Sequence, residues 1–115
     1  MRLFRSGRMP WTERKGYRKR PLVTEEELGA AGTFLQEVSF IPGKTVPLHY
    51  HKRTKEVFIA LDRADFRING EDIVMEPTDV LICEPGDVHG NPRIERQFRI
   101  LVMKLDFDPD DTVWL

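Results

Sequence analysis

Two histidines and a glutamate lie within eight positions of the chain, in the stretch "HYHKRTKE" at residues 49–56. In a β-strand, residues i and i+2 point to the same side at a spacing of about 6–7 Å, so His49 and His51 would face together. The polar residues 52–55 can form a turn, after which an antiparallel strand would place Glu56 beside the two imidazoles. Neutral imidazoles together with one carboxylate suit a divalent transition-metal ion.

The third histidine of the chain, His89, ends another predicted strand after "EPGDV". It lies 33 residues beyond Glu56, far enough to come from a different strand, so one site would account for every histidine. Cys83 has two interpretations: a reactive thiol near His89 or the metal, or a small buried apolar residue. We favour the second because free cysteine is usually a buried hydrophobe.

Short strands are predicted to position these residues. The run "GTFLQEVSFI" places Gln36 and Val38 on one face by period-two alternation, and Phe58 and Ala60 share the face of Glu56 in the same way. These four residues are therefore candidates for the wall of a pocket. Gln36 stands out among them, because a polar side chain on an apolar face needs a partner.

Turn signals separate the predicted strands from one another. Asn69-Gly70 is the strongest hairpin signal, Pro47 indicates an edge strand or a bulge, and residues 24–29 have the capping-box pattern of one helical turn. The predicted strands lie within residues 20–23, 32–41, 45–51, 56–61, 65–75, 79–89 and 96–105. Many short strands with glycine and proline between them indicate a β-sandwich or a small barrel.

In type and spacing, the candidate ligands resemble the two metal-binding motifs of the cupin family. The matching positions are Gly43, His49, His51 and Glu56 in the first motif, and Gly86 and His89 in the second. The resemblance covers roughly residues 32–105. It implies an all-β fold, a single-domain cupin jelly-roll barrel (double-stranded β-helix), with the metal inside.

Four positions of the motifs depart from the family pattern. Two glycines of the pattern are replaced by Arg63 and Thr78, which predicts turns of altered shape. Glu84 stands in place of a proline and Arg93 in place of an asparagine, and both could alter the mouth of the barrel. None of the four positions is a metal ligand in the family, so the departures bear on the substrate and not on the metal.

The resemblance implies a metal-dependent function. One divalent transition-metal ion per chain, either Fe, Mn, Ni, Zn, Co or Cu, would be held by His49, His51, Glu56 and His89, with two positions of an octahedral ion left open. Cupins with such a site include dioxygenases, decarboxylases and isomerases, so an oxidoreductase, lyase or isomerase is implied with its reaction type open. The alternative is a non-catalytic, metal-dependent module that binds or senses a small molecule.

The charge of such a site favours a small anionic ligand. A divalent ion held by three neutral histidines and one glutamate keeps an excess positive charge, and an uncompensated buried charge is costly. A carboxylate, an enolate or a similar oxygen chelator would fill the open positions and neutralise that excess. Lys52, Arg53 and Lys55 would add positive potential if their turn lines the mouth, and a solvated loop is the other interpretation.

The composition is that of one globular domain, and its net charge is too small to produce a strong electrostatic field. A chain of 115 residues can bury a real core, and its net charge of −1 does not attract nucleic acid or membranes. The single cysteine cannot form an internal disulfide, and no signal peptide or membrane span is visible. We therefore expect a cytoplasmic protein whose ligand is a small molecule.

Basic residues are concentrated at the N-terminus, where residues 1–20 carry eight basic side chains and one acidic side chain. We expect a basic N-terminal arm at 1–20 and a barrel domain at 21–115. The overall charge and the lack of an aromatic-basic motif favour a solvated tail or a dimer contact over nucleic-acid binding. We also expect a homodimer in which the arm covers a sheet edge or face of the partner.

Overall fold

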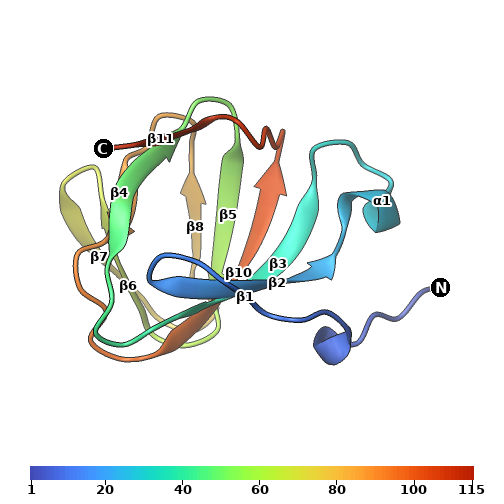
Figure 1. Cartoon of the computed structure of the whole chain (residues 1–115), viewed down its shortest axis with the longest axis horizontal. Helices are drawn as coiled ribbons and strands as arrows, with labels where there is room; N and C mark the ends of the chain where they lie inside the picture. The colour runs from blue at the N-terminus through green and yellow to red at the C-terminus, as the bar shows by residue number, and fades with distance from the viewer.

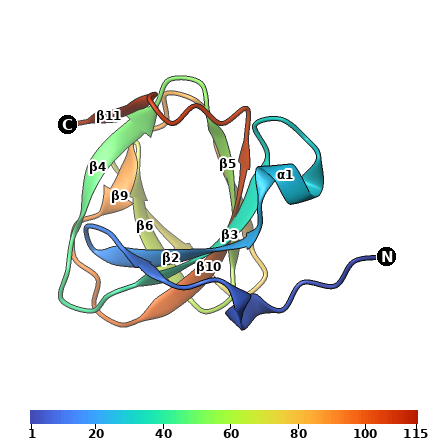
Figure 2. The same ribbon diagram turned by 45° about the vertical axis from the view of Figure 1, so that its right-hand side comes forward.

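The computed structural model describes all 115 residues, and the chain consists almost entirely of β-strands (Figure 1). Eleven strands form two antiparallel sheets that face each other and wrap around a common interior (Figure 2). The predicted all-β jelly-roll barrel is therefore confirmed. The two helical segments are a 3-10 turn at Ser6–Arg8 and α1 at Glu25–Leu28, and neither has the length or apolar character needed to cross a membrane.

One sheet has six strands and the other has five. In spatial order the six-stranded sheet contains β1 (Thr12–Glu13), β2 (Tyr17–Val23), β3 (Phe34–Phe40), β10 (Phe98–Leu105), β5 (Lys55–Ala60) and β8 (Val80–Cys83). The five-stranded sheet contains β11 (Thr112–Trp114), β4 (Val46–His51), β9 (His89–Asn91), β6 (Ala64–Ile68) and β7 (Glu71–Met75). Strands that follow one another along the chain often lie in opposite sheets, so both sheets contribute residues to the shared interior.

Two local signals in the sequence produce the predicted turns. Asn69 and Gly70 connect β6 to β7 with φ angles of 51° and 80°, the left-handed conformation that a tight hairpin turn requires. At α1 the Thr24 side chain accepts a hydrogen bond from the Glu27 amide, and the Glu27 carboxylate accepts one from the Thr24 amide. Gly29 ends this helix with a φ of 68°.

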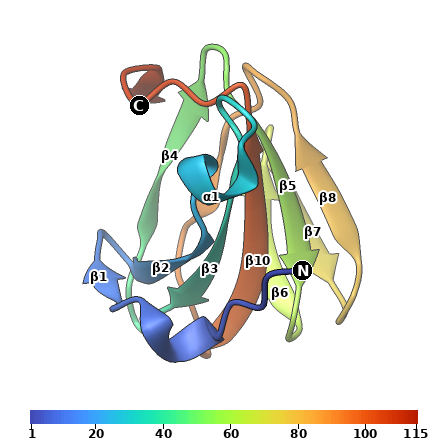
Figure 3. The same cartoon turned by 90° about the vertical axis from the view of Figure 1, so that its right-hand side faces the viewer.

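The N-terminal segment forms the outer strands of the six-stranded sheet, and Figure 3 shows β2 beside β3. β2 runs across the boundary expected at residue 20, so the last residues of the basic segment belong to the sheet. The Arg18 and Arg20 guanidinium groups lie 5.0 and 4.4 Å from the centre of the Trp11 ring. Arg20 also pairs with Glu37 at 2.8 Å. The arginines of β2 are thus engaged on the outer side of the barrel.

Inward-facing phenylalanines fill one end of the barrel. The rings of Phe40 and Phe98 stack at 4.5 Å, and Phe66 meets both rings edge-on at 5.5 and 5.7 Å. Phe58 packs on Phe66 at 5.3 Å. All four are buried, and each contributes about 1.5–3 kcal/mol to the stability of the fold. This packing leaves the other end of the interior free to hold a cavity.

Candidate metal centre

The sheet register brings the three histidines together. His49 of β4 lies directly opposite His89 of β9, and His51 follows on the same side of β4. The register shifts between Val46 and His49, around Pro47, which has no amide hydrogen for the ladder; this irregularity agrees with the predicted bulge. One ring nitrogen of each histidine lies within 4.8 Å of those of the other two. The three histidines therefore lie close enough to hold a metal ion.

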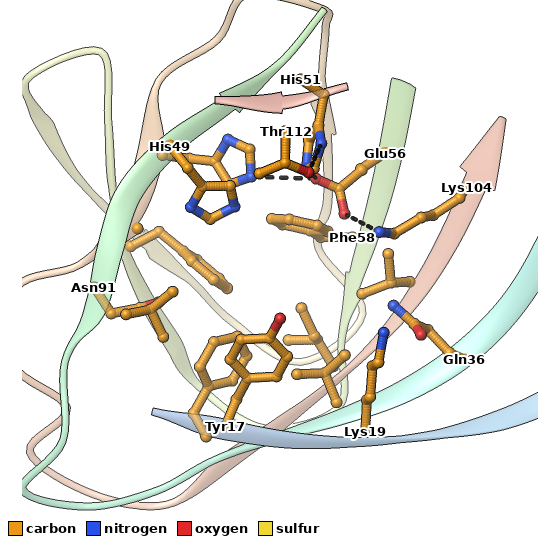
Figure 4. Close-up of a pocket in the computed structure, with 18 of the residues that line it drawn as sticks. Tyr17, Lys19, Gln36, His49, His51, Glu56, Phe58, Asn91, Lys104 and Thr112 are labelled. Atoms are coloured by element: carbon orange, nitrogen blue, oxygen red, sulfur yellow. Dashed lines mark hydrogen bonds and ion pairs between the residues drawn. The ribbon is translucent and has the colours of Figure 1, made fainter. Parts of the chain in front are cut away.

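Glu56 approaches the histidines from the opposite sheet, at the start of β5 (Figure 4). Its Oε1 atom lies 3.0 Å from Nε2 of His51 and 3.1 Å from Nε2 of His89. This buried oxygen nevertheless has no hydrogen bond of good geometry in the protein, which is costly for a buried polar atom. A cation among these atoms would satisfy the oxygen, so the donor set of imidazole nitrogens and one carboxylate fits a transition-metal ion.

Hydrogen bonds at the other ring nitrogen fix the orientation of two histidines. Nδ1 of His49 lies 2.8 Å from the carbonyl oxygen of Pro47, and Nδ1 of His89 lies 2.9 Å from that of Asp87. A carbonyl oxygen can only accept, so Nδ1 carries the proton in both rings. Nε2 is therefore the nitrogen that each ring directs into the site, as in metal-binding histidines whose outer nitrogen is held by a neighbouring acceptor.

His51 is oriented by side chains that the sequence analysis missed. Its Nδ1 atom lies 3.3 Å from Oδ1 of Asp111 and 3.1 Å from Oγ1 of Thr112. The Oδ2 atom of Asp111 accepts hydrogen bonds from the amides of Arg53 and Thr54, at 2.9 and 2.7 Å. Burial acts to raise the pKa of Asp111, but these amide bonds outweigh it and lower the pKa to about 2. Asp111 therefore joins the turn after β4 to the imidazole of His51.

Burial and contact with Glu56 set the charges of the site. Burial lowers the pKa of His49 to about 4, and the neighbouring His89 and His51 add to this shift, so His49 is neutral at pH 7. Burial also acts to lower the pKa of His89, but the adjacent Glu56 carboxylate raises it above its usual value. Burial acts to raise the pKa of Glu56, and the two imidazoles together with Lys104 hold it well below its usual range. Glu56 is therefore a carboxylate.

A cavity of about 340 Å³ adjoins the histidines and Glu56 inside the barrel (Figure 4). Three of the four predicted wall residues, Gln36, Val38 and Phe58, line this cavity. Ala60 does not line it, because it is completely buried in the core farther along β5. A cavity of this size is within the usual range for sites that bind small molecules.

The cationic residues of the cavity differ from those that the sequence suggested. Lys52, Arg53 and Lys55 do not line it. Instead Lys19 of β2 and Lys104 of β10 do, and Lys104 lies 3.8 Å from Oε2 of Glu56. The signal that could have revealed them is strand alternation, because each lysine occupies the inward-facing position of its strand.

Cys83 has the surroundings of a core residue. It is only 2% exposed and lies opposite Glu56 in the pairing of β8 with β5. Burial raises the pKa of its thiol to about 12, with the charges of Glu56 and Asp87 adding to the shift. A thiol that stays protonated is a poor nucleophile, so the structure supports the interpretation of Cys83 as a buried apolar residue.

Comparison with known proteins gives a family match and a set of similar folds. The family described as "Cupin domain" matches residues 36–103, which is more than half of the chain. No curated protein matches the sequence. The matched segment contains all three histidines and Glu56. β2 precedes this segment, and Asp111 follows it.

Solved structures with the same fold have different reported activities. The polyketide cyclase RemF from Streptomyces resistomycificus is 19% identical, with a TM-score of 0.81 and coverage of 100% of this chain and 87% of that chain. A predicted oxalate decarboxylase from Thermotoga maritima is 18% identical, with a TM-score of 0.76 and coverages of 90% and 98%. A Streptomyces nucleoside dehydratase variant with uridine is 12% identical, with a TM-score of 0.78 and coverages of 100% and 90%.

Proposed function

Because this chain belongs to the cupin family, we propose that it holds one divalent transition-metal ion on His49, His51, His89 and Glu56 and uses it to bind or transform a small oxygen-chelating anion. The observation that carries the proposal is the convergence of three imidazole nitrogens within 4.8 Å of one another, with the buried Oε1 atom of Glu56 at 3.0 and 3.1 Å from two of them. When bound, the ion would supply Lewis acidity and a template for a chelating ligand.

The residues around the histidines support this function in separate ways. The carbonyl groups of Pro47 and Asp87 hold the imidazoles of His49 and His89 with Nε2 directed inward. Lys104 partly compensates the charge of Glu56 and leaves the cavity without excess negative charge. Phe58 and the other apolar wall residues lower the local dielectric constant, which would strengthen electrostatic interactions with a bound anion.

The cavity favours a ligand-binding role over a purely structural metal site. A storage or structural barrel would have the metal position capped by protein or the interior filled, whereas here about 340 Å³ adjoins the histidines. The reaction type is open among dioxygenase, decarboxylase and isomerase chemistry. The alternative function is a non-catalytic metal-dependent module that binds or senses a small molecule. An enzyme would convert its ligand into a product, whereas a binding module would not.

The proposal can be tested with lactate and its neutral amide, lactamide, on protein loaded with Co²⁺. Lactate should change the visible spectrum of the ion and bind more tightly than lactamide, because its carboxylate compensates the positive site. Tighter binding of lactamide, or no spectral change with either compound, would contradict the proposal. Oxygen uptake and product analysis with a panel of small acids, using the ion found in the purified protein, then distinguish an enzyme from a binding module.

A further inference from the structure

The strand β2 places alternate side chains on opposite sides of the barrel wall. Tyr17 and Lys19 line the cavity, whereas Arg18 and Arg20 lie on the outer side with the Trp11 ring. Figure 4 shows the Tyr17 hydroxyl and the Lys19 ammonium directed into the cavity from β2, across the interior from the histidines. This strand lies outside the family match, which begins at residue 36.

Three polar groups on this wall have no partner in the protein. The Tyr17 hydroxyl, the Lys19 ammonium and the Gln36 carboxamide make no hydrogen bond or ion pair, although all three line the cavity. Gln36 is a largely buried residue, 7% exposed, that borders the cavity. By contrast, Lys104 lies within 3.8 Å of Glu56. The unpaired groups are therefore available to a ligand in the cavity.

The charges of the cavity favour a ligand with more than one negative charge. Two lysines against the single carboxylate of Glu56 give an excess of one positive charge, and a divalent ion would raise this excess to three. Burial, and to a smaller extent the charges of Lys104 and Arg14, lower the pKa of Lys19, whereas the charge of Glu56 acts to raise it. An anion that reaches only the metal would leave Lys19 without a counter-charge.

We propose that Lys19, Tyr17 and Gln36 form a second recognition subsite, which binds an acidic oxygen group at the far end of the ligand. The ligand is then a small dianion: one end chelates the metal through two oxygens, and the other end carries a carboxylate or a phosphate. Lys19 supplies the charge, and the Tyr17 hydroxyl and the Gln36 amide donate hydrogen bonds to the same group. This inference rests on the proposed function, because the first end of the ligand is placed at the metal.

Matched acids with and without a second acidic group test the subsite. Malate is compared with 2-hydroxybutyrate, 2-hydroxyglutarate with 2-hydroxyvalerate, and 3-phosphoglycerate with glycerate, by calorimetry on the Co²⁺-loaded full-length protein. At least one dianion should bind about tenfold or more tightly than its monoanionic partner, since a charge-assisted hydrogen bond in a buried site has that effect. The two diacids and the phosphate compound distinguish a carboxylate from a phosphate at the far end.

Variants of β2 link this preference to Lys19. Lys19→Met keeps most of the aliphatic stem and should abolish the dianion preference while binding of the monoanions changes less than about threefold. Lys19→Arg keeps the positive charge and should retain much of the dianion preference, whereas Tyr17→Phe should weaken this preference. Arg18→Met is the matched control, because Arg18 is the next residue along and lies on the outer face. It should leave every affinity unchanged.

The outcomes separate this inference from the proposed function. If monoanions change the Co²⁺ spectrum but no dianion binds more tightly, or if Lys19→Met keeps the preference, the subsite is wrong and the metal function stands. If no acid changes the Co²⁺ spectrum, the metal function fails and the subsite fails with it. Circular dichroism checks whether Lys19→Met is folded. If it is unfolded, Tyr17→Phe provides the test instead: a weaker dianion preference in this variant supports the subsite, and an unchanged preference contradicts it.

Discussion

Glu56 and Asp111 are two buried carboxylates with opposite surroundings. Oδ2 of Asp111 accepts two backbone amide hydrogen bonds, so this carboxylate already has its partners within the protein. Oε1 of Glu56 has none, although it is equally remote from solvent. A satisfied carboxylate fixes local structure, and an unsatisfied one is available for binding. At the scale of single residues, the two acids therefore have different roles: Glu56 is a ligand candidate, and Asp111 positions His51.

Replacing Asp111 tests this division of roles. In Asp111→Ala the imidazole of His51 loses an orienting acceptor, so metal affinity should fall about 10–100-fold. The free energy of unfolding should fall by about 1–3 kcal/mol, because the amides of Arg53 and Thr54 lose their acceptor. Competition with a coloured chelator measures the first effect, and urea denaturation of the metal-free protein measures the second. The exposed Asp110→Ala serves as the control, and unchanged metal affinity in Asp111→Ala would refute the positioning role.

The ligand candidates could be predicted from the sequence, whereas their supporting residues could not. His49, His51 and Glu56 lie within one short stretch, so strand alternation was enough to bring them together. Asp111 comes from a segment 60 residues beyond His51 and reaches it only because β11 pairs with β4. A long-range contact of this kind leaves no periodic signal in the sequence, so it requires the fold.

At the scale of the elements, Thr78 in the turn before β8 has a backbone conformation that glycine usually adopts. Thr78 has a φ of 73°, in the left-handed region that is unfavourable for a β-branched residue. The side chain is exposed, so a substitution there leaves the packing unchanged. We therefore expect strain at Thr78, and the altered turn shape expected from the missing glycine stays a prediction.

Thr78→Gly should stabilise the protein. Relief of the left-handed strain exceeds the extra entropy of glycine in the unfolded chain, which leaves a gain of about 0.5–1 kcal/mol. Thermal denaturation measures this gain as an increase in Tm of a few degrees. The reverse change, Gly70→Thr, is the matched comparison, because Gly70 has a φ of 80° with open space around it and should lose stability. A lower Tm for Thr78→Gly would show that the turn is not strained.

The strands were predicted best where they face a packed core. The hairpin at Asn69-Gly70 and the strand at β3 agree with the sequence because most of their inward residues are apolar. β2 was predicted only from residue 20, although it begins at Tyr17. Its inward residue Lys19 faces a cavity, so the hydrophobic alternation that identifies a strand is missing there. The inward-facing lysine therefore explains why the start of the strand was not predicted, and it also makes the strand a candidate for ligand recognition.

At the scale of the whole molecule, we predict a homodimer. β2 pairs with β3 of its own chain, and the edge strand β8 exposes Val80 and Ile82 by 59% and 51%. An exposed apolar edge is a site of association. Light scattering should give twice the chain mass, and the double variant Val80→Lys, Ile82→Lys should be monomeric. A wild-type protein that stays monomeric at high concentration would exclude the dimer.

Metal removal should lower the stability of the whole fold. The proposed ligands come from β4, β5 and β9, so an ion would connect both sheets. A ligand that binds only the folded state adds about 4 kcal/mol when its free concentration is a thousand times Kd. Calorimetry before and after chelation should therefore show a clear decrease in Tm that re-addition of the ion reverses. An identical Tm after confirmed removal would mean that the site is not coupled to folding.

The most direct test of the central claim is the metal content of the protein purified without added metal, measured by mass spectrometry beside that of His89→Ala. His89 supplies one of the three converging imidazoles and contacts Glu56. We predict about one transition-metal ion per wild-type chain and a marked loss in the variant, with circular dichroism showing that both are folded. Wild-type protein that binds no transition metal even when one is supplied, or a His89→Ala variant with full metal content and unchanged affinity, would contradict the proposed site.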